Sequence, residues 1–184
     1  MRLKKISLAL ATAALLVLPV TAAIKAMSLR ELMGITQDAV HGKIVARDTV
    51  RLNHPWENAL YTRVTIEGES LRTGEQGRFQ VVFHGSHSPD DWYGISSMPT
   101  LQDSRTGGET VVFFAEHPML PGQNLVFDWS GLYRVEQGFG EPVVIGKGEG
   151  MAFAENTRLS EVRTRVSAMH AELANAPKAP GLSK

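Results

Sequence analysis

Apolar side chains fill four consecutive positions, Val111 to Phe114, shortly after the paired glycines Gly107 and Gly108. A strand with one face in water alternates apolar and polar residues, and this run does not alternate. The pattern therefore predicts a buried strand within 107–116, both faces of which contact other parts of the protein. The remaining elements are expected to be organised around this strand.

Period-two alternation predicts most of the other strands. Thr62, Val64 and Ile66, for example, alternate with more polar residues, which places them together on one face of a strand. Gly42 interrupts an earlier alternating segment, and we expect a bulge or bend there. In chain order, the further predicted strands cover residues 38–48, 61–71, 78–84, 131–136 and 141–146.

Two helices are predicted, one at each end of this strand-rich region. Ser28 and Glu31 form the Ser-x-x-Glu pattern of a capping box, so a short helix should follow to about Gln37. A second helix, with Asn156 or Thr157 as its cap, carries a narrow apolar stripe at spacings of three and four residues. The stripe consists of Leu159, Val162, Val166, Met169 and Leu173.

Together these elements predict a mainly β fold, a small OB-like Greek-key barrel of five to six strands with an N-terminal and a C-terminal helix. Closing a sheet into a barrel removes the exposed edges that an open sheet would leave. The length of 184 residues fits a single domain with one core.

The first 23 residues have the three parts of a secretory signal peptide. Residues 1–5 are basic, residues 6–20 are almost continuously apolar, and small residues follow up to Ala23. The apolar run is shorter than the roughly 18 to 20 residues that span a bilayer. We therefore expect a signal peptide at 1–23, a single domain at 24–175 and a disordered tail at 176–184. The mature protein should be periplasmic or secreted, with no membrane span.

The net charge and the absence of cysteine exclude several classes of function. Without the basic residues of the signal peptide, the chain has 16 basic against 19 acidic residues, a net charge of −3. A mildly acidic domain lacks the electrostatic footprint of a nucleic-acid-binding protein. The absence of cysteine excludes disulfides, thiolate zinc sites and cysteine nucleophiles.

Four strand motifs carry a resemblance to a family of exported, mostly uncharacterised bacterial proteins that look like OB-fold or netrin-like barrels. The motifs are Asp38–Val45, Tyr61–Ile66, Gly108–Phe114 and Tyr133–Gly138. The resemblance covers about two thirds of the mature chain and implies a barrel fold. The glycine-rich stretch that follows the third strand in the family is replaced here by residues 84–93, and no family active site carries over.

Residues 85–108 show no period, and a loop this long in a compact domain is usually functional or disordered. His84, at the end of the preceding strand, and His87, Asp90 and Asp91 in the loop form a grouping of metal-ligand types within one short segment. The alternative for these residues is a solvated polar loop. Because the spacing matches no named motif, the sequence implies no definite cofactor, and a divalent metal ion remains the one candidate.

Aromatic side chains in two loops suggest a contact surface. Trp92, Tyr93 and, in the loop at 53–58, Trp56 combine apolar area with a polar group, as ligand-contacting residues often do. The alternative is that Trp92 and Tyr93 fold back over an open end of the barrel.

No enzymatic motif is complete in this chain. Residues 94–98 lack the second glycine of a nucleophile elbow. Residues 146–150 lack the spacing and the Lys-Ser/Thr ending of a phosphate-binding loop, and are read as a flexible exit from the last strand.

The leading hypothesis is an exported, non-enzymatic binding or envelope-associated module whose partner is an unidentified protein or glycan of the cell envelope. The alternative is a metal-binding protein or metal-dependent enzyme that uses residues 84–91. A protease-inhibitor-like module, by analogy with netrin-like domains, is a third reading, but those domains rely on cysteines that this chain lacks.

Export is directly testable by intact-mass measurement of the protein recovered from its producing cells. We expect the mature chain to lack about the first 22 or 23 residues, because signal peptidase cleaves after small residues such as those at 22 and 23. Full-length chain in the membrane fraction would contradict this expectation.

Overall fold

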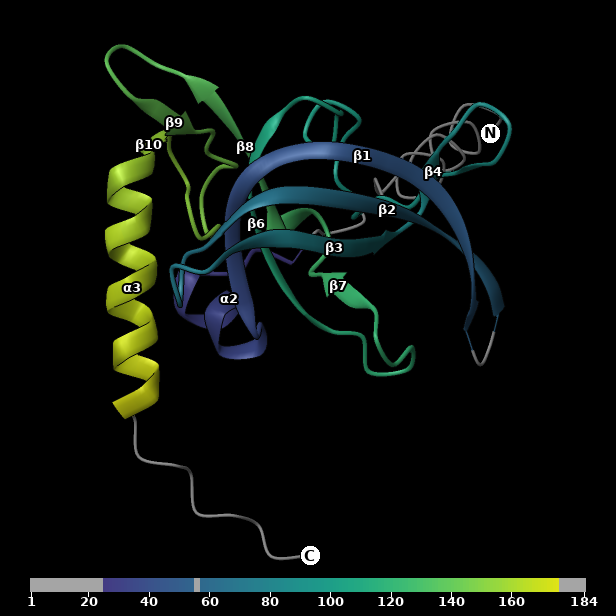
Figure 1. Ribbon diagram of the computed structural model, residues 1–184, viewed down its shortest axis with the longest axis horizontal. Coiled ribbons are helices and arrows are strands. Elements are labelled where there is room, and N and C mark those ends of the chain that lie inside the picture. The colour runs from purple at the N-terminus through teal and green to yellow at the C-terminus, as the bar shows by residue number, and fades with distance from the viewer. Residues whose placement is uncertain (1–24, 55–56, 176–184) are drawn as a thin grey trace, which may run out of the picture.

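The computed structural model describes residues 25–54 and 57–175 (Figure 1). The predicted signal peptide, Trp56 and the predicted tail at 176–184 lie outside these residues. The elements in chain order are α2 (Leu29–Ile35), β1 (Asp38–His54), β2 (Glu57–Ser70), β3 (Gln76–His84), β4 (Ser86–His87), β5 (Trp92–Tyr93), β6 (Glu109–Glu116), β7 (Asn124–Val126), the 3-10 turn η1 (Trp129–Gly131), β8 (Leu132–Gln137), β9 (Pro142–Val144), β10 (Thr157–Arg158) and α3 (Leu159–Asn175).

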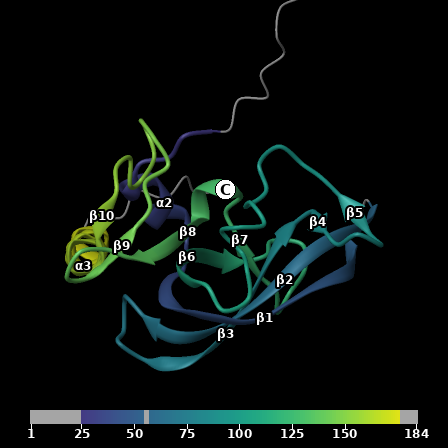
Figure 2. The same cartoon turned by 90° about the horizontal axis from the view of Figure 1, so that it is seen from above.

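Five strands close into a barrel in the order β1-β2-β3-β7-β6, and β6 returns to pair with β1. Only the β3–β7 pairing in this barrel is parallel. Figures 1 and 2 show β1, β2 and β3 curving side by side around β6 and β7. β8, β9 and β10 extend the sheet outward from β6. The prediction of a mainly β, OB-like barrel with a helix at each end is confirmed.

Burial of β6 on both faces is also confirmed. Val112 and Phe114 lie in the core inside the barrel. Val111 and Phe113 point the other way and pack in a second core beneath the two helices. All four side chains are buried, which explains why the sequence of this strand does not alternate.

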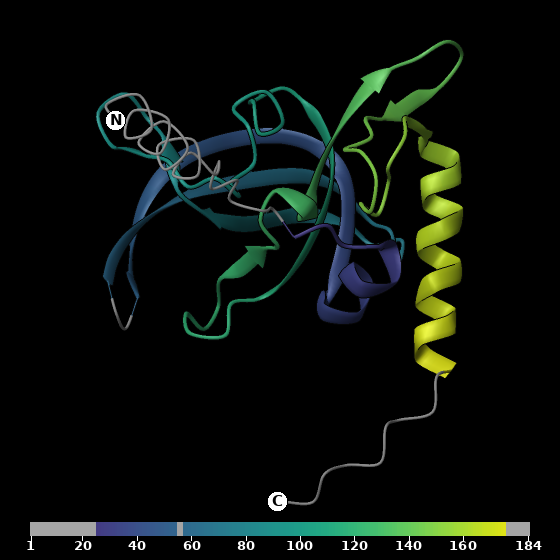
Figure 3. The same ribbon diagram turned by 180° about the vertical axis from the view of Figure 1, so that it is seen from behind.

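The two helices cover that second core. Ser28 and Glu31 form the predicted capping box at the start of α2. The predicted apolar stripe of α3 faces the same core, with Leu159, Val162 and Val166 buried. Figure 3 shows α3 standing along one side of the molecule, beside α2. None of the helices in the described part of the chain is long and apolar enough to cross a membrane.

The start of α3 differs from the prediction. Residues 157–158 form β10, and the helix begins at Leu159. Asn156 does not cap it, because its Oδ1 accepts a hydrogen bond from the Gly146 N–H at 3.0 Å. This bond helps to fix the segment after β9, where the sequence had suggested a flexible exit.

One of the five strands that close the barrel is not among the strands predicted from the sequence. The fifth barrel strand is β7, whose three residues are too few to show a period. The strand predicted at 131–136 corresponds to β8, which pairs with β6 outside the closed barrel. The β3–β7 seam has a single register pair, Val82 with Leu125, beside a bond from Asn124 Nδ2 to the Gln80 carbonyl at 3.0 Å.

The register shift in β1 lies between Ile44 and Ala46, not at Gly42 as predicted. Gly42 instead faces Gly68 across the β1–β2 pair. A Cβ atom on Gly42 would collide with the Glu67 carbonyl oxygen and with the Gly68 Cα. The two glycines are therefore needed because the strand backbones approach closely here.

Replacing Phe113 by Ala tests the role of β6. Phe113 is fully buried, and its ring contacts those of Tyr133 and Phe153 at centroid distances of 6.2 and 6.3 Å. We expect urea denaturation to show a loss of about 3 to 5 kcal/mol, because a large cavity would remain. A loss below about 1 kcal/mol would show that β6 is peripheral to the fold.

Candidate functional site

A short hairpin, formed by β4 and β5, lies at the start of the loop at 85–108. The Ser86 side chain is buried, and its Oγ lies 2.7 Å from Thr49 Oγ1 on β1. Thr62 Oγ1, on β2, donates a hydrogen bond to the Gly85 carbonyl at 2.8 Å. These contacts hold the base of the hairpin on the barrel, and Figure 2 shows it at the end of the molecule away from α3.

Gly85 sets the direction in which the hairpin leaves β3. Its φ of +102° lies in the region that favours glycine. A Cβ atom at this position would also collide with Met98 Sδ and lie 3.0 Å from the Tyr93 carbonyl oxygen. A side chain is therefore excluded at the point where β3 turns into β4.

Trp92 and Tyr93 on β5 are exposed to solvent, at 71% and 38% of their surface. The Trp92 ring lies over Gly94, where an added Cβ would come within 2.6 Å of it. Trp92 is thus accessible, whereas the ring of Tyr93 folds back in part and packs against His84. Together they form an aromatic pair on a small anchored sheet.

A row of rings connects Tyr93 to the barrel. Tyr93 packs against His84 at a centroid distance of 5.4 Å, and His84 stacks on Tyr61 at 5.0 Å. Tyr61 in turn meets the edge of His117 at 5.9 Å. The supporting rings come from β3, β2 and the segment after β6, so three segments outside the hairpin hold Tyr93 in place. We call Trp92, Tyr93 and the supporting rings of His84, Tyr61 and His117 the hairpin site.

His117 is oriented by its own loop. Its Nδ1 accepts a hydrogen bond from the Met119 N–H at 3.1 Å. In the neutral imidazole the proton is therefore on Nε2, which lies 3.4 Å from Tyr61 Oη. The side chain is buried, so His117 supports the Tyr61 ring from within the protein.

The hairpin site borders a third apolar cluster, which is buried on the outer face of β2 and β3 and which we call the outer patch. Val82 points outward because its neighbours Val81 and Phe83 both lie in the barrel interior. Leu125 lies beside Val82 on β7. The outer patch comprises Val50, Leu52, Ala59, Tyr61, Val82, Leu120 and Leu125.

Asp128 precedes η1, interacts with Ser97 and His84, and is a residue that the sequence did not indicate. Among the described residues it is the non-glycine with positive φ, at 49°. Burial raises the pKa of its carboxyl group, while a hydrogen bond from Ser97 and the charge of His84 act in the opposite direction. The Trp129 N–H that follows donates to the Ser97 carbonyl at 2.5 Å. Through these contacts with Ser97, the segment 128–129, which follows β7, is attached to the loop at 85–108.

The structure does not bring the four predicted metal ligands together. His84 belongs to the row of rings, whereas His87 Nε2 lies 3.1 Å from a backbone carbonyl oxygen of its own loop. Asp91 pairs with Arg51 at 3.4 Å, and Asp90 is exposed. Within residues 25–54 and 57–175, no group of three or more histidine and acidic side chains is placed to hold a metal ion.

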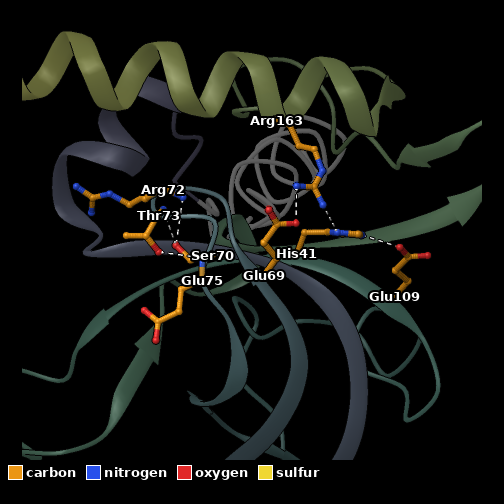
Figure 4. Close-up of polar contacts among 8 residues, drawn as sticks. All are labelled: His41, Glu69, Ser70, Arg72, Thr73, Glu75, Glu109 and Arg163. Atoms are coloured by element: carbon orange, nitrogen blue, oxygen red, sulfur yellow. Dashed lines mark hydrogen bonds and ion pairs between the residues drawn. The ribbon is translucent and has the colours of Figure 1, made fainter.

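A polar cluster, separate from the hairpin site, links α3 to the barrel (Figure 4). Arg163 on α3 donates to Glu69 at 2.8 Å and to His41 Nδ1 at 3.0 Å. His41 Nε2 lies 2.6 Å from Glu109 on β6. Since Arg163 occupies Nδ1, neutral His41 carries its proton on Nε2 and donates it to Glu109.

Burial lowers the pKa of His41, and the Arg163 charge adds to this effect, while Glu109 opposes it. Both ring nitrogens already have partners inside the protein, so neither is available for proton transfer to a ligand. The cluster is therefore a structural contact that fastens α3 to β1, β2 and β6. His41 and Glu69 are register partners, but the approach of Arg163 depends on the packing of α3 and could not be read from spacing.

Lys147 occupies an unusual position between two aromatic rings. Its Nζ lies 4.4 Å from the centre of the Trp129 ring and 5.0 Å from that of Tyr133. Burial lowers the pKa of Lys147 to about 8, with the charge of Asp103 acting against this shift and that of Arg134 adding to it. Nζ also donates to the Trp129 carbonyl, so the lysine holds η1 against β8.

Comparisons of the chain with models of protein families, with curated proteins and with solved structures found no match. The resemblance drawn from the strand motifs therefore stays a prediction.

The His41 cluster makes stability depend on pH. The pKa of His41 is lowered in the folded protein, so protonation favours the unfolded chain, in which the pKa is near 6.5. The stability that neutral His41 contributes to the folded protein is fully present above about pH 6.5. It is lost as the pH falls through the lowered pKa of His41 in the folded protein.

We expect the unfolding free energy of the native protein to fall more steeply below about pH 6.5 than that of His41→Gln, in urea titrations between about pH 5 and 8. His87→Gln serves as the control, since His87 contacts a loop carbonyl and is expected to follow the native curve. Parallel curves for the native protein and His41→Gln would contradict the assignment.

Proposed function

We propose that the protein is an exported, non-enzymatic binding module that contacts its ligand through Trp92 and Tyr93 of the hairpin site. The observation that carries the proposal is the exposure of Trp92, 71% of its surface, on a hairpin anchored to the barrel. An aromatic side chain on a rigid support loses little conformational freedom when a partner covers it. Such residues commonly provide most of the affinity of an interface.

The surroundings of the pair favour a protein or glycan of the cell envelope as the partner. Arg51 and Asp91, which pair at 3.4 Å and are each half exposed, provide a polar rim beside the hairpin. The aromatic rings of Trp92 and Tyr93, with the charged groups of Arg51 and Asp91 beside them, suit a ligand that has both apolar and hydrogen-bonding surface. Export rests on the composition of residues 1–23.

The non-enzymatic part of the proposal is supported by the way the titratable side chains are used. His41 is held by Arg163 and Glu109, and His84 packs between Tyr61 and Tyr93. These histidines stabilise contacts between elements of the fold. A general base needs a nitrogen directed toward a ligand.

The double change Trp92→Ala with Tyr93→Ala tests the proposal. Trp92 is largely exposed, so its loss should change stability by no more than about 0.5 kcal/mol. Tyr93→Ala should cost somewhat more, because its ring packs on His84. We expect the folded double variant to lose at least about tenfold in affinity for components captured from a solubilised envelope fraction or a glycan array.

Phe139→Ala is the control, since Phe139 is a fully exposed aromatic residue outside the hairpin site, at the turn between β8 and β9. This control should bind like the native protein. Equal capture by the native protein and the double variant would contradict the proposal. A zinc-dependent rise in melting temperature that disappears in His87→Ala would contradict it in favour of the metal-binding alternative.

A further inference from the structure

A pocket of about 340 Å³ lies between α2 and the C-terminal half of α3. Figure 2 shows α3 at the end of the molecule opposite β4 and β5. One part of its wall is apolar, formed by Met33 of α2 and by Leu173 and Ala174 of α3. The other part is provided by Arg72, after β2, and by His170 of α3. The lining contains no acidic residue. This volume is at the small end of the range for ligand pockets, so it suits a small molecule or a single side chain.

Arg72 is fixed in the wall by three hydrogen bonds. Its Nη1 donates to the carbonyl oxygens of Thr36, at 3.5 Å, and Gln37. Its Nε donates to His170 Nδ1 at 3.0 Å. In Figure 4 the side chain extends from the turn after β2 toward α2. The bonds from Nη1 cap the C-terminus of α2, which has no basic residue in its last turn.

These bonds leave hydrogen-bond donors that the cap does not use. Nη2 of Arg72 carries two N–H groups, and no described residue accepts from them. Because His170 Nδ1 accepts from Arg72, the neutral imidazole carries its proton on Nε2, which is a further donor. The polar part of the pocket therefore offers N–H groups.

The charge of Arg72 also has no acidic partner among the described residues. Asp38, the nearest carboxylate in sequence to the α2 cap, accepts from Ser70 Oγ at 2.8 Å and from the Ala39 N–H at 2.7 Å instead. Glu172, two residues from His170, pairs with Arg30. Capping by three neutral acceptors leaves a full positive charge at the pocket.

We propose that this pocket binds a carboxylate carried on a small apolar group. The carboxylate accepts hydrogen bonds from Arg72 Nη2 and His170 Nε2, which are the charge-assisted and planar donors that such groups prefer. The apolar group lies against Met33 and Leu173. Both a free aliphatic acid and the C-terminal carboxylate of a peptide have this chemistry. The inference is independent of the proposed function of the hairpin site.

Binding is measured by titrating the full protein with five probes and following amide chemical shifts and heat. The probes are butyrate, butyramide, N-acetyl-leucine, N-acetyl-leucinamide and inorganic phosphate. We expect saturable binding of both carboxylates, with shifts centred on residues around Arg72 and His170, and at least about tenfold weaker binding of the matched amides. Tighter binding of N-acetyl-leucine would identify a peptide terminus as the ligand, and tighter binding of butyrate a free acid.

Two variants separate binding from capping, because neither removes the bonds from Arg72 Nη1 to the end of α2. His170→Phe removes the Nε2 donor, together with the acceptor of Arg72 Nε, and should weaken carboxylate binding at least about tenfold. Leu173→Glu places a carboxylate at the apolar wall, where it should pair with Arg72 and abolish probe binding while the protein stays folded. His87→Phe, a similar change elsewhere, should bind normally.

The proposal is overturned if neither carboxylate shows saturable binding to the native protein. It is equally overturned if the amides or phosphate bind as tightly as the carboxylates, or if His170→Phe and Leu173→Glu bind like the native protein. Any of these results would leave Arg72 with only its role as a helix cap.

Discussion

The burial of β6 on both faces is the constraint on which the rest of the architecture depends. Val112 and Phe114 complete the barrel interior, while Val111 and Phe113 form the floor on which the helices pack. Each face needs its own cover, because apolar area left in water would cost roughly 25 cal/mol per Å². The barrel and the helical layer therefore share one strand and stabilise each other.

How much could be predicted from the sequence depended on the length and period of each element. The non-alternating run of β6, the alternation of β2 and the stripe of α3 are long enough to show their pattern. The strands β7, β4 and β5 have only two or three residues each, which is too few to show a period. Their strand conformation comes from pairing with neighbouring strands, and the sequence does not reveal those partners. Gly42 was correctly singled out, but its function is close approach to Gly68, which depends on a strand partner that spacing does not reveal.

For the candidate site, the sequence indicated which residues are involved but not how their side chains are arranged in space. Trp92 and Tyr93 stand out in sequence and are exposed in the structure. Their supports, Tyr61 and His117, come from segments about 30 and 25 residues away. The register of β2 and β3 places Tyr61 opposite His84, whereas His117 is brought close by the segment that follows β6. The grouping of His84 with His87 failed as a common site because the chain turns at Gly85, which separates the directions of the two imidazoles.

The parallel seam between β3 and β7 has a consequence for the way the barrel opens. A single register pair and one side-chain bond hold it, whereas β1 pairs with β2 from Val40 to His54. Weakly paired strands open at lower free energy than the body of a sheet. Breathing of the native state should therefore begin at this seam, where the C-terminal end of β3 leads directly into Gly85. β7 would stay paired with β6 in such an opening, so only the backbone groups along the β3–β7 seam become open to solvent, and the hairpin site can move without unfolding β6.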